Sequence, residues 1–463
     1  MNTAEHIHFI GIGGYGMSAI ARVMLEMGYT VTGSDVARQE LTEKLAAKGA
    51  QIFIGHEPEH VTGADLVVYS TALSRDNVER RAAEELNIPV LHRAQMLARL
   101  MNAGKGVAVA GAHGKTTTSS MIALVMETCK ADPTYIIGGE IVNVGTNAKA
   151  GKGEYVVAEA DESDGSFLQY HPALAIVTNI EPDHLENYDG DFEKLKSAYV
   201  QFLSQVKADG KAIVCGDDET VNEIVPRLSQ EAAGRLVTYG IDSDAHYRAE
   251  NIELGDRKVS FVMSHQGLPL GKVQLSVPGR HNVYNAMATI ITCLEAGLQF
   301  EDIVVAIHEF RGAKRRFQVL GEVDDILVID DYAHHPTEIE VTISAAKATG
   351  KRIVAVFQPQ RYTRTFFLLE QFSRAFSDAD EVIITDIYSP AGEQQIEGVN
   401  SSKLVEMIKK NSNANTSYIP TKEEVLVYLS GKVAPGDLVI TMGAGDIWKV
   451  ADSLAKTLKQ ERA

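Results

Sequence analysis

Two short glycine-rich stretches of this sequence contain residue types that bind phosphate. The first is "GIGGYG", which contains Gly11, Gly13, Gly14 and Gly16. The second is "GAHGKTTT", which contains Gly111, Ala112, His113, Gly114, Lys115, Thr116 and Thr117. Glycine lets the backbone approach a phosphate closely, lysine supplies positive charge, and a threonine hydroxyl can bind Mg²⁺. The chain therefore has two candidate phosphate-binding loops.

The first loop has the spacing of a dinucleotide-binding fingerprint. Its glycines follow the pattern G-x-G-x-x-G after an apolar run at residues 6–10, and Asp35 ends the next apolar run. This context predicts a strand, a tight turn and a helix whose N-terminus faces a diphosphate, with Asp35 near a ribose. A nicotinamide dinucleotide and a UDP-sugar both offer these two features. A tight turn without any ligand is a third interpretation.

The second loop predicts ATP binding. It departs from the usual G-x-x-x-x-G-K-[ST] pattern, because Val109 stands where the first glycine is expected. Lys115 can still reach the β- and γ-phosphates, and the Thr116 hydroxyl can bind Mg²⁺.

Acidic residues and one histidine follow two later apolar runs. They are Glu159, Asp161, Glu162, Asp164, Asp183 and His184. The carboxyl ends of parallel strands open onto one edge of a sheet, so we expect these side chains beside the phosphate loop, where they can bind Mg²⁺. A solvated acidic loop is the alternative, and histidine is a less usual ligand for Mg²⁺.

Apolar runs alternate with amphipathic stretches along almost the whole chain, which predicts an α/β fold with parallel sheets. We expect a Rossmann-like N-terminal domain at 1–103, a central P-loop ATPase domain at 104–316 and a Rossmann-like C-terminal domain at 317–463. Between 246 and 278, short apolar runs joined by turns predict an antiparallel patch attached to the central domain.

Composition excludes several classes of protein. The formal net charge of −18 argues against nonspecific binding of nucleic acid. No apolar run is long enough to span a bilayer, and the N-terminus lacks a basic region followed by an apolar stretch. Cys129, Cys215 and Cys293 have neither metal-ligand nor disulfide spacing. We therefore expect a cytoplasmic protein without a membrane anchor, either a monomer or a weak homodimer.

Seven motifs occur in a characteristic order: "GAHGKTTT", "EADESDGS", "TNIEPDHLENY", "PGRHNVYNA", "GAKRRF", "DDYAHHPTE" and "RYTRT". In these motifs, over essentially its whole length, the chain resembles the Mur ligases, ATP-dependent amide-forming enzymes of peptidoglycan precursor synthesis. The resemblance implies that the first domain binds a UDP-sugar, the central domain binds ATP, and the third helps to bind an amino acid. The first loop, "GIGGYGMSAIA", resembles that of the alanine-adding member, which implies UDP-N-acetylmuramate and L-alanine as substrates.

The resemblance also implies roles for individual residues. Besides residues 111–117, the ATP-binding set comprises His281, Asn282, Asn285, Asp331 and His334, with His335 as the alternative to His334. The Mg²⁺ ligands are Thr116, Glu159 and His184. Catalysis at the γ-phosphoryl group falls to Lys115, Glu159, His184 and Arg316. The UDP-sugar set adds Asp35, Ser70, His92 and Arg93 to the four glycines of the first loop. The amino-acid set is Tyr332, Arg361 and Arg364, since arginine can pair with both oxygens of a carboxylate.

Plainer interpretations and two departures accompany these roles. Arg316 lies in "KRRF", which could be an exposed basic patch, and His334 and His335 could cap a helix that starts at Pro336. Gln360 stands where the family has a histidine, so an imidazole role in amino-acid binding is in doubt. Tyr199 stands in the register of a carbamylated lysine of several relatives, so we expect no modified lysine.

Together these features predict a ligase reaction. The muramyl carboxylate attacks the γ-phosphorus of ATP, and the alanine amine then attacks the acyl phosphate to give amide, ADP and phosphate. Three alternatives stay open: a ligase that adds a preformed tripeptide to the same UDP-sugar, a nicotinamide-dependent oxidoreductase, and a nucleotide-binding regulator without chemistry.

Overall fold

Three sheets organise the chain, of five, ten and six strands. The structure is a computed structural model that describes residues 6–70, 73–74, 76–255, 258–389 and 393–461. Contacts define two compact units, one of residues 1–251, 261–274 and 283–310, the other of 252–260, 275–282 and 311–463. No helix in the described ranges is both long enough and apolar enough to cross a membrane. The predicted α/β class is confirmed.

The first sheet is entirely parallel, in the order β3-β2-β1-β4-β5. Its strands are β1 (His6–Ile10), β2 (Thr30–Asp35), β3 (Gln51–Ile54), β4 (Leu66–Tyr69) and β5 (Val90–His92). Its helices are α1 (Tyr15–Glu26), α2 (Glu40–Ala47), α3 (Val78–Glu85) and α4 (Arg93–Ala103), with a 3₁₀ turn, η1 (Pro58–Val61). The chain leaves β1 toward β2 on one side and later returns to β4 on the other. The carboxyl end of β1 is therefore the switch point at which doubly wound sheets bind ligands.

The middle sheet has the order β15-β14-β13-β12-β11-β10-β6-β9-β7-β8. Its strands are β6 (Lys105–Ala110), β7 (Thr134–Ile141), β8 (Thr146–Lys149), β9 (Tyr155–Glu159), β10 (Leu174–Val177), β11 (Lys211–Cys215), β12 (Leu236–Gly240), β13 (Tyr247–Leu254), β14 (Val259–His265) and β15 (Leu268–Leu275). Strand β6 lies between β10 and β9 and is parallel to both. The loop after β6 therefore lies between the loops after β10 and β9.

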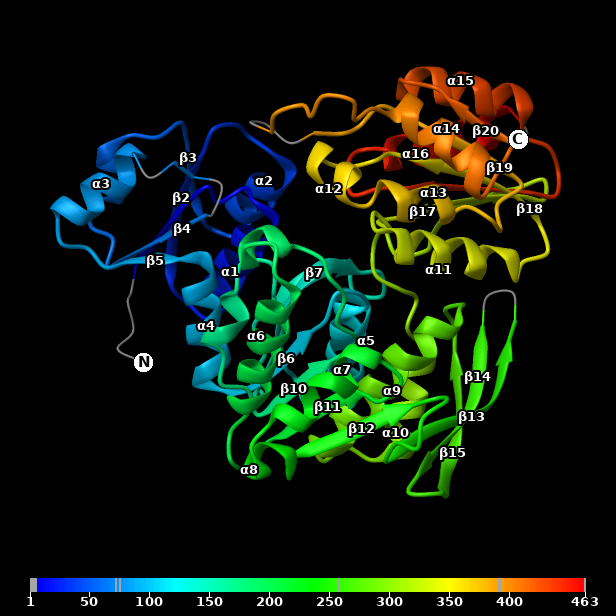
Figure 1. Cartoon of the computed structure of the whole chain (residues 1–463). Coiled ribbons are helices and arrows are strands. Elements are labelled where there is room, and N and C mark those ends of the chain that lie inside the picture. The colour runs from blue at the N-terminus through cyan, green and yellow to red at the C-terminus, as the bar shows by residue number, and fades with distance from the viewer. Residues whose placement is uncertain (1–5, 71–72, 75, 256–257, 390–392, 462–463) are drawn as a thin grey trace. The chain divides into compact units, whose positions relative to one another are not determined.

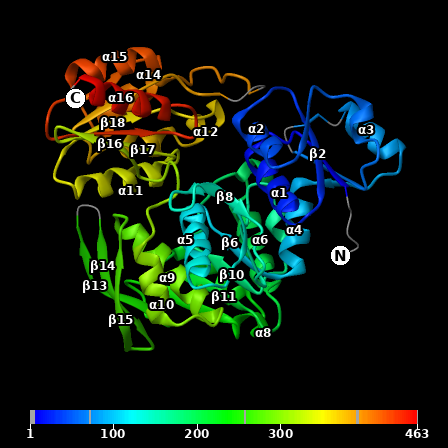
Figure 2. The same ribbon diagram turned by 180° about the vertical axis from the view of Figure 1, so that it is seen from behind.

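Helices and short 3₁₀ turns accompany this sheet. They are α5 (Lys115–Thr128), α6 (Phe192–Ser204), α7 (Glu219–Ile224), α8 (Gln230–Ala233), α9 (Arg280–Glu295) and α10 (Phe300–His308), with η2 (Ser166–Gln169), η3 (Leu185–Tyr188) and η4 (Val225–Arg227). Helix α5 packs against β6, β7 and β9 (Figure 2). Ten of its fourteen residues are buried, so α5 is a core helix whose first turn is held in place by packing on the sheet.

Strands β13, β14 and β15 lie side by side at one edge of the middle sheet (Figure 1). Only Gln266 and Gly267 separate β14 from β15, and both have positive φ, 49° and 79°. A two-residue connection with this geometry joins antiparallel strands. The antiparallel patch predicted at 246–278 is thus present.

The third sheet has the order β16-β17-β21-β18-β19-β20. Its strands are β16 (Gln318–Val323), β17 (Ile326–Asp331), β18 (Arg352–Phe357), β19 (Glu381–Ile384), β20 (Thr416–Tyr418) and β21 (Asp437–Met442). Strand β16 is antiparallel to β17, and the other pairs are parallel.

Helices cover both faces of this third sheet (Figure 1). They are α11 (Pro336–Lys347), α12 (Tyr362–Phe367), α13 (Leu369–Arg374), α14 (Ser401–Asn411), α15 (Lys422–Lys432) and α16 (Trp448–Glu461). Leu327 and Ile329 of β17 face a core with residues of α11, α13 and α14. Ile326 and Val328 face the opposite core, with residues of α15 and α16. This alternation accounts for the continuous apolar run of β17, which is buried on both faces.

Candidate active site

The second glycine loop joins β6 to α5, as the sequence predicts. Gly111 and Gly114 have positive φ, 134° and 83°. A Cβ on Gly111 would lie 2.1 Å from Thr178 Oγ1, and one on Gly114 would lie 2.6 Å from Asn285 Oδ1. Both positions therefore require glycine for their backbone conformation and for space.

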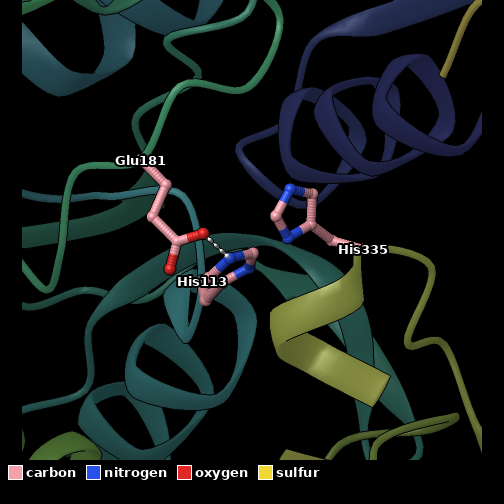
Figure 3. A group of neighbouring side chains, drawn as sticks. All are labelled: His113, Glu181 and His335. Carbon is pink, nitrogen blue, oxygen red and sulfur yellow. Dashed lines mark ion pairs between the residues drawn. The ribbon is translucent and has the colours of Figure 1, made fainter. Parts of the chain in front are cut away.

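The residues after β10 hold this loop from the side. Asn179 accepts hydrogen bonds from the N–H of Ala112 through its backbone oxygen (3.2 Å) and from the N–H of His113 through Oδ1 (2.8 Å). Thr178 Oγ1 donates to the oxygen of His113 at 2.6 Å. The imidazole of His113 forms an ion pair with Glu181, Nε2 to Oε2 at 3.2 Å (Figure 3). The loop is thus fixed by the strand next to its own.

Lys115 is the first residue of α5 and forms an ion pair with Glu162. Its Nζ lies 2.7 Å and 3.0 Å from the two carboxylate oxygens, and it donates to the oxygen of Gly111 at 2.5 Å. The side chains are 19% and 5% exposed. Burial opposes the positive charge, but the carboxylates of Glu162, Asp161 and Glu159 outweigh it and raise the pKa of Lys115. A positive charge is therefore held at the mouth of the phosphate loop.

The three predicted Mg²⁺ ligands come from three adjacent strand ends. Thr116 lies in the first turn of α5 after β6, Glu159 ends β9, and His184 follows β10 with a positive φ of 56°. Glu159 Oε1 accepts hydrogen bonds from the N–H of Gly138 (2.6 Å) and from Ser119 (3.5 Å). Both of these hydrogen bonds are made to Oε1 and not to Oε2. A hydroxyl and a carboxylate oxygen suit Mg²⁺, whereas the His184 nitrogen is the less usual donor.

Helix α9 supplies the predicted adenine-side residues. Asn285 Oδ1 accepts a hydrogen bond from Thr118 of α5 at 3.2 Å, so Asn285 lies directly against the phosphate loop. Asn282 donates to the oxygen of Pro278 at 2.6 Å. Burial, with a contribution from the Arg316 charge, lowers the pKa of His281 to about 4. The imidazole is therefore neutral at pH 7.

The first glycine loop lies at the switch point of the first sheet. The backbone oxygen of Ser34 accepts the N–H groups of Gly11 (2.8 Å) and Ile12 (3.0 Å). Asp35 Oδ2 accepts the N–H of Gly13 at 2.8 Å. A Cβ on Gly16 would lie 3.1 Å from Arg93 Nη1. The structure thus brings a cation and the N-terminus of α1 together, a suitable setting for a diphosphate.

The remaining predicted residues of this site come from other strand ends. Gly14 is the N-cap of α1. Ser70 follows β4, and its N–H donates to the oxygen of Ile10 at 3.3 Å. A Cβ placed on Gly11 would lie 3.4 Å from the Cβ of Ser70. His92 ends β5 and accepts the N–H of Ala94 at 3.3 Å, which caps α4. The predicted UDP-sugar set therefore gathers along one edge of one sheet.

In the third sheet, Arg316 is fixed through its neighbours on both sides. Arg315 has a φ of 61° and donates to Asp330 (2.8 Å) and to the oxygen of Gly443 (2.6 Å). Phe317 has a φ of 46°, and its N–H donates to Asp331 at 2.6 Å. Burial raises the pKa of Asp331 to about 6 even though Arg316 acts against it. Two left-handed residues therefore flank Arg316, a strained backbone of the kind that occurs at functional sites.

The residues after β17 form one cluster with Arg316. Its guanidinium lies 5.3 Å from the centre of the Tyr332 ring and 3.6 Å from Glu338. Glu338 also accepts the N–H of His334 at 2.9 Å and of His335 at 3.3 Å. His335 occupies the N-cap position of α11 (Figure 3), so one of the two histidines stands where the capping interpretation placed the pair.

Gln360 and the two predicted arginines follow β18. Arg364 Nη1 donates to Gln360 Oε1 at 2.9 Å, so the amide stands where the family has an imidazole and accepts a bond from Arg364. Arg361 is the N-cap of α12 and has a φ of 67° and a ψ of 135°, a conformation that L-residues avoid. Strands β17, β21 and β18 are parallel neighbours. Tyr332 and the arginines therefore leave the same edge of this sheet.

The structure gives roles to positions to which the sequence analysis assigned none. These are Thr178 and Asn179, which hold the phosphate loop, Arg315 and Glu338, which hold Arg316 and its neighbours, and Ser119, which contacts Glu159. Thr178 and Asn179 directly follow an apolar run and open the motif "TNIEPDHLENY", so the sequence carried two signals for them. Tyr199 is buried on α6 against Phe167, with ring centres 5.3 Å apart.

The glycine loop, its lysine and the oxygen-bearing side chains around it have the arrangement of a nucleotide-binding enzyme of the P-loop kind. Comparison with known families identifies the family to which the chain belongs. Three family models match in succession: "Mur ligase family, catalytic domain" at 6–105, "Mur ligase middle domain" at 109–293 and "Mur ligase, glutamate ligase domain" at 315–445. The chain belongs to the Mur ligase family.

Individual relatives resemble the chain along its length. Proteins from Symbiobacterium thermophilum and Pelotomaculum thermopropionicum, both named UDP-N-acetylmuramate–L-alanine ligase, are 48% and 50% identical. Each match covers 100% of this chain, with 96% and 99% of the relative. The solved structure of a UDP-N-acetylmuramate–alanine ligase from Thermotoga maritima matches with a TM-score of 0.81 and 29% identity, over 98% of this chain and 99% of the other. A murein peptide ligase from Psychrobacter arcticus shares the fold, with a TM-score of 0.68 at 24% identity over 98% of both chains.

Proposed function

We propose that this chain joins L-alanine to the lactyl carboxylate of UDP-N-acetylmuramate with the cleavage of ATP to ADP and phosphate, in peptidoglycan precursor synthesis. The observation that carries the proposal is the presence of two glycine loops, each between a strand and a helix, in a chain whose full-length relatives bear that activity in their names. One loop would hold the diphosphate of the UDP-sugar and the other would hold ATP. A nicotinamide-dependent oxidoreductase would leave the second loop without a purpose.

The chemistry follows from charge at the phosphate loop. The carboxylate of the UDP-sugar attacks the γ-phosphorus, and ADP leaves. Lys115 and Arg316 stabilise the negative charge that spreads over the transferring phosphoryl group. Bound Mg²⁺, held by Thr116, Glu159 and His184, would supply further positive charge there. Closure that excludes water protects the acyl phosphate from hydrolysis.

The second half of the reaction requires the amine of alanine at the acyl carbon. Arg361 and Arg364 would pair with the alanine carboxylate, with Tyr332 beside them, and leave the amine free to attack. The carbonyl re-forms as phosphate leaves, so the products are the amide, ADP and phosphate. Asn282, Asn285, His281, Asp331 and His334 would contact the nucleotide outside the reacting phosphate.

The binding of the UDP-sugar rests on the first sheet. Gly11, Gly13, Gly14 and Gly16 would bring the backbone and the α1 N-terminus to the diphosphate, and Arg93 beside Gly16 would pair with it. Asp35, Ser70 and His92 would line the same edge. We further infer a cytoplasmic location, which suits a reaction that consumes ATP and a UDP-sugar and fits three free cysteines. We also propose a monomer or a weak homodimer. Sedimentation of the purified protein tests the oligomeric state.

Phosphate release with each substrate omitted in turn tests the function. Release should require ATP, Mg²⁺, UDP-N-acetylmuramate and L-alanine together. A preformed tripeptide in place of alanine should support little release. Preference for the tripeptide would instead identify the tripeptide-adding ligase, and phosphate release from ATP alone would overturn the ligase assignment.

A further inference from the structure

A buried carboxylate in the first domain has no role in the proposed reaction. Glu79 lies in the first turn of α3 and is 0% exposed. Burying an unpaired carboxylate is strongly unfavourable, so its partners indicate why it is retained. Three of those partners are side chains at hydrogen-bond distance: Ser34, His60 and His8.

The geometry around Glu79 is asymmetric. Oε2 accepts from Ser34 Oγ at 2.5 Å and faces His8 Nε2 at 3.4 Å. Oε1 accepts from His60 Nδ1 at 2.7 Å and from the N–H of Glu57 at 3.3 Å. Burial would raise the pKa of Glu79, but the hydrogen bonds from His8, Ser34 and His60 outweigh it and lower the pKa to about 2. Glu79 is therefore an anion at pH 7.

One of these partners leads directly to the first glycine loop. Ser34 is also 0% exposed, and its side chain donates to Glu79 while its backbone oxygen accepts the N–H groups of Gly11 and Ile12. The next residue, Asp35, accepts the N–H of Gly13. A carboxylate on α3 thus fixes the end of β2, and the end of β2 fixes the first turn of the loop.

We propose that Glu79 is a positioning residue for the UDP-sugar, acting through Ser34 on the backbone of the first glycine loop. The inference rests on the proposed function, because it takes the ligand of that loop to be UDP-N-acetylmuramate. Without Glu79, the Ser34 hydroxyl and the end of β2 lose their charged anchor. Ordering the loop when the ligand binds then costs more conformational entropy, which weakens binding. The ATP site lies on another sheet and is not part of this path.

Steady-state kinetics on the full-length chain tests the proposal. Glu79→Ala should raise KM for UDP-N-acetylmuramate about tenfold, the change expected for loss of one charge-assisted hydrogen bond. KM for ATP and kcat should stay within about twofold. Glu79→Gln keeps an oxygen that can accept from Ser34, and should recover part of the lost affinity.

A matched control separates positioning from simple stabilisation. Glu381 in the third sheet is likewise buried, 3% exposed, and accepts from Arg352, Lys432 and Tyr428. Glu381→Ala removes a comparable buried carboxylate and should lower the thermal midpoint without changing KM for the UDP-sugar. If Glu79→Ala behaves like Glu381→Ala, with a lower midpoint and an unchanged KM, Glu79 is structural and the proposal is wrong.

Ser34→Ala tests the same path without creating an unpaired buried charge, since His60 and His8 still face Glu79. It should raise KM for the UDP-sugar to a similar extent, and the double variant should show less than the sum of the two effects. This arm decides the matter if Glu79→Ala fails to fold: an unchanged KM in Ser34→Ala overturns the proposal.

Calorimetric titration of UDP-N-acetylmuramate into the unaltered protein and into the Glu79→Ala and Ser34→Ala variants distinguishes failure of the Glu79 proposal from failure of the proposed function. If the unaltered protein binds the UDP-sugar and both variants bind it equally well, only the role of Glu79 fails. If the unaltered protein does not bind it at all, the proposed function itself fails.

Discussion

Replacing Lys115 by alanine should lower both turnover and stability, and the two losses should have different causes. In the proposed reaction Lys115 supplies one preorganised charge to the transferring phosphoryl group, and removing such a group typically costs about 100-fold or more in turnover. It also neutralises Glu162, whose side chain is only 5% exposed. Removing one partner of a buried ion pair lowers the free energy of unfolding by about 3–5 kcal/mol. Because Lys115 is partly exposed, we expect a loss at the lower end of this range, about 3 kcal/mol.

A second substitution separates the two effects. Glu162→Gln in the Lys115→Ala background removes the unpaired charge and should restore most of the lost free energy of unfolding, while turnover stays low. Lys105→Ala, at the start of β6, is the matched control, because its ion pair with Glu154 is exposed (49% and 61%) and should contribute little to either measurement.

Phosphate-release rates and urea unfolding of the three variants measure these quantities, with UDP-sugar affinity as a check that the first domain is intact. Near-normal turnover in Lys115→Ala would refute the ATP-site assignment. Unchanged stability in that variant, or no recovery in the double variant, would refute the account of Glu162.

Four further outcomes are expected. Gly13→Ala places a Cβ 2.7 Å from Asp35 Oδ2 and should raise KM for the UDP-sugar but not for ATP in steady-state assays; the reverse would mean that the two loops are exchanged. Glu159→Gln removes one ligand charge, so a Mg²⁺ titration should shift to higher concentration, and an unshifted curve would move the ligand role to Asp161, Glu162 or Asp164. Heavy oxygen placed in the muramyl carboxylate should appear in inorganic phosphate by mass spectrometry, with ADP as the other product; label in AMP, or pyrophosphate among the products, would exclude the acyl phosphate. Gln360→Leu removes the oxygen to which Arg364 donates and should raise KM for alanine, whereas Gln360→His should retain much of the affinity; equal values for both would remove Gln360 from the site.

Local patterns predicted the loops well, because the information needed lies within a few residues. Gly111 and Gly114 precede a lysine and a buried helix, and the structure gives both of them positive φ. The partners of these loops depend instead on sheet order, which a single sequence does not specify. Asn179 contacts the phosphate loop only because β10 pairs with β6, and Glu162 meets Lys115 only because β9 pairs with β6 on the other side.

The same limit applies to Glu79 and Arg315. In "NVERRAAEELN", Glu79 has the sequence environment of an exposed helix, and its burial depends on three other elements. Arg315 and Arg316 are adjacent basic residues, which sequence pattern cannot tell apart. Both guanidinium groups lie over the Tyr332 ring, at 5.0 Å and 5.3 Å from its centre. The structure ties Arg315 to Asp330 and to the loop after β21, whereas Arg316 faces Glu338.

The backbone at Arg361 sets the stability of the protein against the role proposed for its side chain. A non-glycine residue at φ 67° and ψ 135° costs about 1–3 kcal/mol, and glycine at this position would avoid most of that cost. Selection for heat resistance alone would therefore favour glycine at position 361, at the expense of a guanidinium that the proposed reaction uses.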